Sequence, residues 1–272
     1  MIYFPNAKIN LGLYITEKRP DGFHNIESVF YPVAWTDALE IVETPNATKE
    51  FNLEFSGLPI AGNAGDNLLY KAFYLIKEKR KIPKITVYLY KALPMGAGLG
   101  GGSSDCAFFI NALNTQFDLK LSEEERISLV RPLGSDCAFF IKNKPVFAWQ
   151  KGDEFKPIEL NLSAYYIAVV FPDVHSNTKD AYSLVKAEKP VTSLLQLLNE
   201  PLANWKNNIK NDFETSVFAK YPVVKTIKEE LYNSGAIYAS MSGSGSAVFG
   251  IFESLPNIGQ LSKYPNWIGK ML

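Results

Sequence analysis

The chain has 272 residues, 47% hydrophobic and 21% charged, a balance that excludes intrinsic disorder and suits one large domain or two ordinary ones. Its 28 basic and 28 acidic residues cancel, which excludes a generic nucleic-acid coat and a polybasic membrane binder. The cysteine and histidine content, 2 of each, excludes a multi-bridge disulfide framework and a standard structural zinc site. We identify no secretory signal peptide and no apolar run of transmembrane length, so we expect a cytoplasmic protein.

Apolar periodicity predicts an α+β chain of mixed element order rather than a regular βαβ series. In the first half it predicts strands over 7–15, 28–35, 38–43, 51–55 and 85–90. One helix is expected to begin at residue 67, with Asp66 as its N-cap. A second is expected over 103–115, and a third after the capping box that Ser122 and Glu125 form. Residues 133–141 are predicted to be extended.

The second half predicts a strand over 165–172 and helices over 178–186, 192–198 and 223–233. Short strands are expected over 236–241 and 247–252, around a glycine- and serine-rich loop at 242–246. We expect two domains, residues 1–150 and 151–272.

The glycine-rich stretch 94–104 is the most unusual part of the chain, because four of the six residues from Gly96 to Gly101 are glycine. It lies between an alternating strand and the start of a helix. Glycine lets the backbone approach a ligand closely, and a helix start offers unpaired N–H groups and a positive dipole end. Together these features predict an anion site, most naturally for phosphate, rather than a flexible linker.

Other phosphate-binding motifs fit this stretch poorly. Gly96, Gly98 and Gly101 match the spacing of a dinucleotide fingerprint, but no second strand ends about 20 residues later. A Walker loop is excluded because no Gly-Lys-Ser/Thr follows, and the protein-kinase motifs are absent. Ser176 and Lys179 match one weak serine-hydrolase motif whose partner motif is missing.

Five sequence segments together resemble those of the GHMP kinases. Within that family they resemble most the kinases that act on a cytidyl polyol. The segments are Ala7–Leu11, the Arg19–His24 loop, the Pro94–Ser104 stretch, Leu133–Phe140 and Ser242–Ser246, in chain order. The resemblance extends from Ala7 to about Phe252. It implies a two-domain fold, with an N-terminal ATP-binding part like ribosomal protein S5 domain 2 and a ferredoxin-like C-terminal part.

The resemblance implies that Lys8 and Asp136 are catalytic. Asp136 would accept or orient the proton of the acceptor hydroxyl, and Lys8 would pair with it. Taken alone, Asp136 suits a turn or a cap, and a strand lysine usually points to solvent. ATP would be bound by the glycine-rich residues Pro94, Met95, Gly96, Ala97, Gly98, Leu99, Gly100, Gly101, Gly102, Ser103 and Ser104.

On the acceptor side, the resemblance implies that Phe23 and Tyr182 stack on a cytosine ring and that His24 contacts the edge of the base. Thr178 and Asn10 would hold the polyol, and Asn10 shares the face of Lys8 because it follows two residues later on a strand. Each aromatic residue also has an alternative, purely structural role. Phe23 could be a loop residue that fills the core, and Tyr182 could be a core residue on the face of a helix.

The implied reaction is ATP-dependent phosphorylation of the 2-hydroxyl of 4-diphosphocytidyl-2-C-methyl-D-erythritol in non-mevalonate isoprenoid precursor biosynthesis. The implied cofactors are ATP as phosphoryl donor and Mg²⁺, whose protein ligands stay unassigned. The expected partner is this small molecule, with no nucleic acid and no membrane, and the oligomeric state is undetermined. Alternatives are another GHMP kinase, of homoserine or mevalonate type, and a catalytically inactive nucleotide-binding homologue.

Overall fold

A computed structural model describes residues 1–60 and 64–272, and its contacts group them into two compact units. Unit 1 comprises Met1–Ala7, Trp35–Met95 and Gly100–Asn143, and unit 2 comprises Lys8–Ala34, Gly96–Leu99 and Lys144–Leu272. The chain therefore passes repeatedly from one unit to the other. The mixture of helices and sheets confirms the predicted α+β class.

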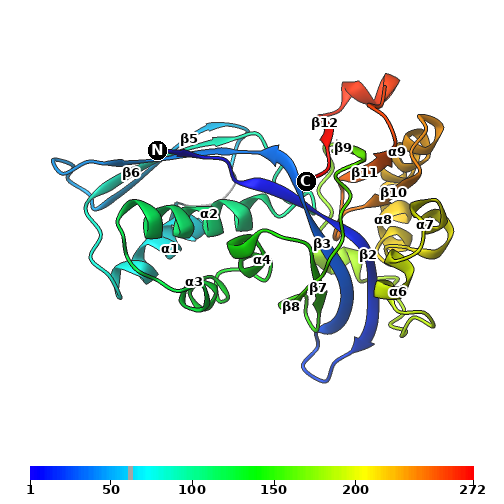
Figure 1. Cartoon of the computed structure of the whole chain (residues 1–272), viewed down its shortest axis with the longest axis horizontal. Coiled ribbons are helices and arrows are strands. Elements are labelled where there is room, and N and C mark those ends of the chain that lie inside the picture. The colour runs from blue at the N-terminus through cyan, green and yellow to red at the C-terminus, as the bar shows by residue number, and fades with distance from the viewer. Residues whose placement is uncertain (61–63) are drawn as a thin grey trace. The chain divides into compact units, whose positions relative to one another are not determined.

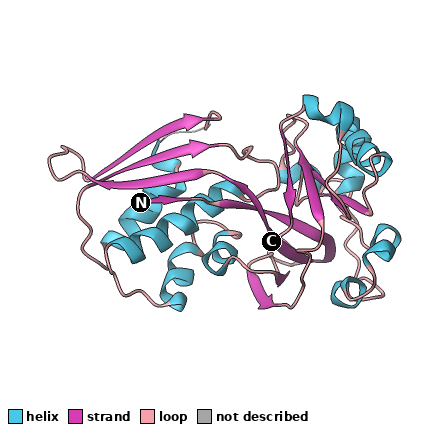
Figure 2. Ribbon diagram, turned by 45° about the horizontal axis from the view of Figure 1, so that its top comes forward, coloured by secondary structure: helices cyan, strands magenta, loops and turns pink. Residues whose placement is uncertain are grey.

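Unit 1 is a sheet with helices on one face (Figures 1 and 2). The strand order is β1-β4-β6-β5, in which β6 pairs antiparallel with β4 and parallel with β5. The strands are β1 (Ile2–Tyr3), β4 (Ala38–Glu43), β5 (Phe51–Gly57) and β6 (Ile85–Lys91). The helices are η1 (Ala64–Asp66), α1 (Leu68–Lys77), α2 (Gly101–Gln116), α3 (Glu123–Val130) and α4 (Cys137–Lys142).

Unit 2 contains two four-stranded sheets, ordered β2-β3-β7-β8 and β10-β11-β9-β12. The first is built from β2 (Asn6–Lys18), β3 (His24–Thr36), β7 (Val146–Trp149) and β8 (Glu154–Pro157), and the first two residues of β2 and the last two of β3 count with unit 1. The second is built from β9 (Tyr166–Val170), β10 (Tyr238–Met241), β11 (Val248–Phe252) and β12 (Asn266–Lys270). Its helices are α5 (Thr178–Ala181), α6 (Leu194–Leu198), α7 (Leu202–Asn208), α8 (Glu214–Lys220), α9 (Pro222–Asn233) and η2 (Gly259–Lys263).

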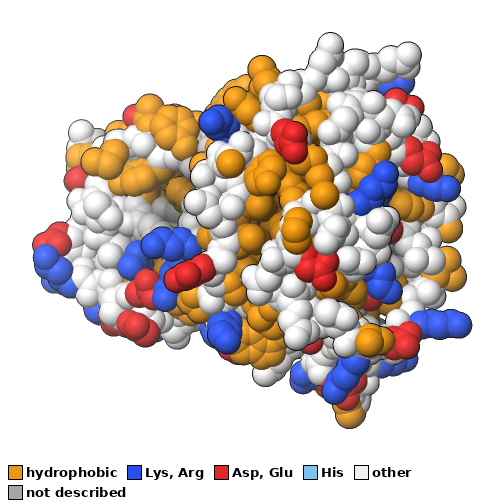
Figure 3. Space-filling view, turned by 45° about the vertical axis from the view of Figure 1, so that its right-hand side comes forward, with side chains coloured by type: hydrophobic (Ala, Val, Ile, Leu, Met, Phe, Trp, Pro, Cys, Tyr) orange, Lys and Arg blue, Asp and Glu red, His pale blue; other side chains and the backbone are white. Residues whose placement is uncertain are grey.

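The surface carries mixed charge. Basic and acidic side chains are interspersed on the face that Figure 3 shows, in keeping with a formal net charge of +0. Within residues 1–60 and 64–272, no helix combines the length and the apolar character that crossing a membrane requires.

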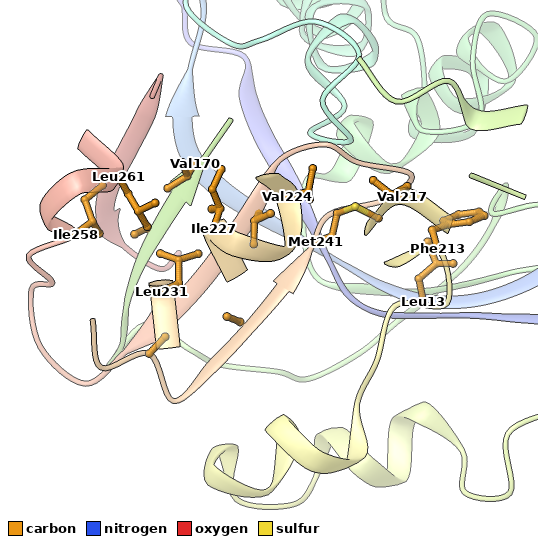
Figure 4. Packing of buried hydrophobic residues seen from close by; sticks show 14 of the residues in the cluster. Leu13, Val170, Phe213, Val217, Val224, Ile227, Leu231, Met241, Ile258 and Leu261 are labelled. Carbon is orange, nitrogen blue, oxygen red and sulfur yellow. The ribbon is translucent and has the colours of Figure 1, made fainter. Parts of the chain in front are cut away.

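The core of unit 2 lies between α8, α9 and the sheet of β9, β10 and β11 (Figure 4). Helix α9 contributes Val224, Ile227 and Leu231, which recur at helical spacing and are at most 1% exposed. They pack in one buried cluster with Val170 of β9 and Met241 at the end of β10. This packing fixes the end of β10, from which the glycine- and serine-rich loop departs.

Three local predictions are wrong. Asn67, not Asp66, caps α1, since its Oδ1 accepts from Leu69 N at 2.9 Å. Residues 133–141 are not extended, because α4 forms after Gly134 accepts a bond from Cys137 N. The predicted helix 178–186 is a single turn, α5. Helices α7 and α8 and strands β1, β7, β8 and β12 were not predicted.

Candidate active site

The glycine-rich turn is held against the loop Ser242–Ser246 inside unit 2. Gly98 has a φ of +78°, and a Cβ at this position would lie 2.0 Å from Ser242 O. Ser242 Oγ donates to Gly98 O at 2.8 Å, and Ala247 N donates to Ala97 O at 3.1 Å. Only glycine therefore fits at position 98, and the serine-rich loop acts as the support of the turn.

Two polar side chains that the sequence did not single out hold this supporting loop. Asn211 Nδ2 donates to Met241 O and to Gly243 O, both at 2.8 Å. Glu214 Oε1 accepts from Met241 N at 2.9 Å, and its Oε2 accepts from Lys228 Nζ at 2.6 Å. Asn211 contacts the loop itself and Glu214 contacts the end of β10 from which the loop departs, each across about thirty positions of sequence, so no local pattern could have revealed them.

Helix α2 of unit 1 begins where the turn ends, and it lacks a side-chain cap. Its N-cap is Gly100, with a φ of 73°, and no side chain bonds to the first N–H groups of the helix. Ser104 N makes the first helical bond, to Gly100 O at 2.8 Å. The N–H groups of Gly101, Gly102 and Ser103 precede that bond, so they are available to an anion at the positive end of the helix dipole.

We expect Gly98→Ala to raise the KM for ATP roughly tenfold or more, because the added Cβ would push the turn off Ser242. Gly235→Ala is the matched control, since Gly235 also has a positive φ, +95°, but a Cβ there meets nothing within 4 Å. It should cost only about 1 kcal/mol of stability. Steady-state kinetics and melting temperatures compare the two variants. A folded Gly98→Ala with the KM of the wild type would refute the role of this turn.

Lys8 is buried in unit 2, contrary to the usual solvent-facing strand lysine, and is only 3% exposed. Its Nζ donates to Asn10 Oδ1 at 2.6 Å and lies 4.6 Å from the centre of the Phe30 ring. Asn10 Nδ2 donates in turn to Ser28 Oγ at 2.8 Å. The bond from Lys8 to Asn10 confirms that the two share one face, and it engages the amide oxygen that was expected to hold a polyol.

Asp136 of unit 1 immediately precedes α4, and its side chain does not cap that helix. Ser135 Oγ donates to Asp136 Oδ1 at 3.4 Å. The segment lies beside the start of α2, because a Cβ on Gly134 would be 3.4 Å from Ser103 Oγ. Unit 1 thus brings the predicted catalytic carboxylate and the predicted phosphate-binding helix start together. Lys8 belongs to unit 2, so its pairing with Asp136 stays a prediction.

The predicted base-binding residues lie together in unit 2, in an arrangement that the sequence did not indicate. The His24 and Tyr182 rings stack, with centres 4.5 Å apart and planes at 18°. Phe213 supports Tyr182 edge-on at 4.8 Å. Phe23 is 60% exposed, with Lys151 Nζ 5.3 Å from its ring centre. His24, rather than Phe23, stacks on Tyr182.

The environment of His24 favours its neutral form. Burial lowers the pKa of the imidazole, and the positive charge of Lys18 lowers it further. A neutral imidazole offers one donor and one acceptor, which is what reading the edge of a base requires. Thr178 Oγ1 lies 3.2 Å from Ser244 Oγ, which links the predicted polyol contact to the serine-rich loop.

Among residues 1–60 and 64–272, no group of three or more His, Cys, Asp and Glu side chains is arranged to hold a metal ion. His175 has no predicted role, yet its Nδ1 would lie 3.3 Å from a Cβ on Gly96, so it borders the glycine-rich turn.

Two family models match the chain: GHMP kinases N terminal domain over residues 67–144, and GHMP kinases C terminal over residues 190–263. A protein of Bacteroides fragilis named 4-diphosphocytidyl-2-C-methyl-D-erythritol kinase is 53% identical over 253 residues, which is 93% of this chain and 92% of that protein.

Solved structures agree in fold. A crystal structure of 4-(cytidine 5'-diphospho)-2C-methyl-D-erythritol kinase has a TM-score of 0.85 and 28% identity, covering 100% of this chain and 99% of that one. The Methanococcus jannaschii mevalonate kinase has a TM-score of 0.68 over 100% of this chain and 98% of that one, but only 13% identity, so it reports on the fold alone.

Proposed function

This chain belongs to the GHMP kinases, among the 4-diphosphocytidyl-2-C-methyl-D-erythritol kinases, and we propose that it catalyses the reaction of that family. It transfers the γ-phosphoryl group of ATP to the 2-hydroxyl of 4-diphosphocytidyl-2-C-methyl-D-erythritol, in non-mevalonate isoprenoid precursor biosynthesis. The observation that carries the kinase chemistry is the glycine-rich turn, fixed at Gly98, that leads into the uncapped start of α2.

The ATP phosphates bind the turn and the first N–H groups of α2, so the ATP site comprises residues 94–104. Magnesium would enter with ATP as the MgATP substrate. When bound, it would neutralise charge on the phosphates. We assign no protein ligand to it.

Asp136 accepts the proton of the 2-hydroxyl as that oxygen bonds to the γ-phosphorus of ATP and ADP leaves. Two features support this role: the carboxylate is not used as a helix cap, and its segment adjoins Ser103. Lys8 lowers the energy of the developing alkoxide with its positive charge. The bond from Lys8 to Asn10 supports this assignment, because it holds the ammonium in one orientation.

On the acceptor side, Phe23 and Tyr182 sandwich the cytosine and His24 reads its edge, while Thr178 and Asn10 hold the polyol. Cytosine binding then requires His24 to leave the face of Tyr182 that it covers here. The exposed Phe23 ring supports the proposal, since a residue that plugs the core would be buried. Homoserine and mevalonate carry no base, so these aromatic residues favour the cytidyl substrate over both.

The other assignments are coarser. We propose that the two family domains meet near residue 150, between the matched segments that end at 144 and begin at 190. The free thiols of Cys106 and Cys137 support a reducing, cytoplasmic location. The mixed surface charge supports a small-molecule partner rather than nucleic acid or a membrane.

The test is product analysis. The purified chain is incubated with MgATP and the cytidyl substrate, and the products are examined by mass spectrometry and phosphorus NMR. We expect one ADP per phosphorylated product, with the new phosphate coupled to the carbon that bears the 2-hydroxyl. Bound ATP without any phosphorylated product would favour the inactive homologue instead.

A further inference from the structure

A buried ionic cluster lies inside unit 1, next to the chain segments that enter and leave the glycine-rich turn Gly96–Leu99. Lys91 ends β6, and its ammonium is fully buried between two carboxylates. Lys91 Nζ donates to Asp105 Oδ2 at 2.7 Å and forms an ion pair with Asp37 Oδ2. Asp105 Oδ1 is buried and has no hydrogen-bond partner among the described residues. Apolar side chains would fill such a site at lower cost, so stability alone does not account for this cluster.

Asp37 ties this cluster to the chain that enters the glycine-rich turn. Its Oδ1 accepts from Ala92 N at 2.6 Å and from Leu93 N at 2.8 Å. These two residues immediately precede Pro94, the first of the proposed ATP-binding residues. The carboxylate therefore fixes the backbone on the incoming side of the turn.

Lys91 and Asp105 tie the same cluster to the chain that leaves the turn. Asp105 lies in α2, one residue after Ser104. A Cβ on Gly101 would lie 3.5 Å from Lys91 Nζ and 3.3 Å from Leu93 Cβ, so the ammonium lies against the first turn of α2. The ammonium of Lys91 thus joins the two carboxylates: Asp37, which bonds the incoming segment, and Asp105 of α2, the helix on the outgoing side.

We propose that Lys91, Asp37 and Asp105 are positioning residues that hold the two ends of the phosphate-binding turn in the geometry that ATP requires. The inference rests on the proposed function only in taking ATP as the ligand of this turn. It assigns these three side chains no contact with substrate.

The cluster also makes the charge next to the first turn of α2 dependent on pH. Burial raises the pKa of Asp105 to about 7, and the negative charge of Asp37 opposes its ionisation while Lys91 favours it. The charged groups that face Asp105 are Lys91 from β6 and Asp37 from the segment before β4. The thiol of Cys106, the next residue of α2, is also nearby, and it interacts in turn with the thiol of Cys137 in α4. With Asp105 protonated the cluster is neutral, whereas ionised Asp105 leaves a net negative charge that repels ATP.

The experiment measures the Kd for MgATP by calorimetry, without any acceptor substrate, so that a failure of the cytidyl assignment does not affect the readout. Lys91→Met should weaken binding about tenfold or more. Arg126→Met is the matched control, because it removes a hydrogen bond from Arg126 to Asn111, which lies in the middle of the same helix α2. It should lower the melting temperature and leave the Kd within about twofold.

Asp105→Asn is a second variant for the same binding measurement. It should keep the fold, because its amide oxygen still accepts from Lys91. In the wild type the Kd for MgATP should rise as the pH increases from 6 to 8, by more than in Asp105→Asn. The ionisation of ATP itself is common to both proteins, so the difference isolates Asp105. A folded Lys91→Met with unchanged Kd, or identical pH profiles of wild type and Asp105→Asn, would overturn the proposal.

Discussion

Asp136→Asn should lower kcat by roughly a hundredfold or more and leave the affinity for ATP nearly unchanged. An asparagine keeps the size of the side chain but does not accept the hydroxyl proton. Asp136 makes no side-chain capping bond to α4, so the substitution does not remove a cap from that helix. Initial rates and calorimetric binding of MgATP separate the two effects.

Ser135→Ala is the matched control for this prediction. It removes the neighbouring hydroxyl, which donates to Asp136 Oδ1 at the long distance of 3.4 Å, without changing the carboxylate. We expect its kcat to stay within about threefold of the wild type. If Asp136→Asn turned over at the rate of the wild type, Asp136 would have no part in the proton transfer.

Tyr182→Ala should raise the KM for the cytidyl substrate by about ten- to a hundredfold, since stacking of an aromatic side chain on a base contributes about 1–3 kcal/mol. The KM for ATP should hardly change, because ATP binds the glycine-rich turn. Tyr182→Phe should be almost silent if stacking dominates. Phe213 packs edge-on against the Tyr182 ring at 4.8 Å and supports it, while the face that His24 now covers at 4.5 Å is shown to accept a planar ring.

The competing explanation is that Tyr182 only packs the core of unit 2, whose edge it touches. Tyr264→Ala addresses this, because Tyr264 is another partly buried tyrosine against the same cluster, far along the chain from the base-binding residues. Both alanine variants should lose stability, but only Tyr182→Ala should lose affinity for the cytidyl substrate. Equal stability losses with the KM of the wild type in both would remove Tyr182 from the base-binding site.

The sequence predicted those elements that a capping motif or an apolar periodicity marks within the element itself. The capping box of Ser122 and Glu125 is present at the start of α3, and the apolar stripe of α9 predicted a helix that ends before Gly235. The run from Cys137 to Ile141 is wholly apolar, so its periodicity does not distinguish a short helix from a strand, and it forms α4.

The sequence indicated which residues form the candidate site, but it could not indicate which contacts these residues make. Alternation on β2 placed Lys8 and Asn10 on one face, yet it could not indicate that this face is buried. The cluster around Lys91 joins positions 37, 91 and 105, whose separation leaves no periodic trace. Asn211 and Glu214 likewise act on a loop that only the tertiary fold brings to them.

The central claim is that this chain is a kinase of the cytidyl polyol, and a substrate panel tests it most directly. ADP release is followed with 4-diphosphocytidyl-2-C-methyl-D-erythritol, mevalonate, homoserine and, as a control without the polyol, cytidine diphosphate. We predict a kcat/KM for the cytidyl polyol at least about a thousandfold above that for mevalonate or homoserine, and no turnover with cytidine diphosphate. A higher kcat/KM for mevalonate or homoserine, or equal ADP release with and without any acceptor, would contradict the account.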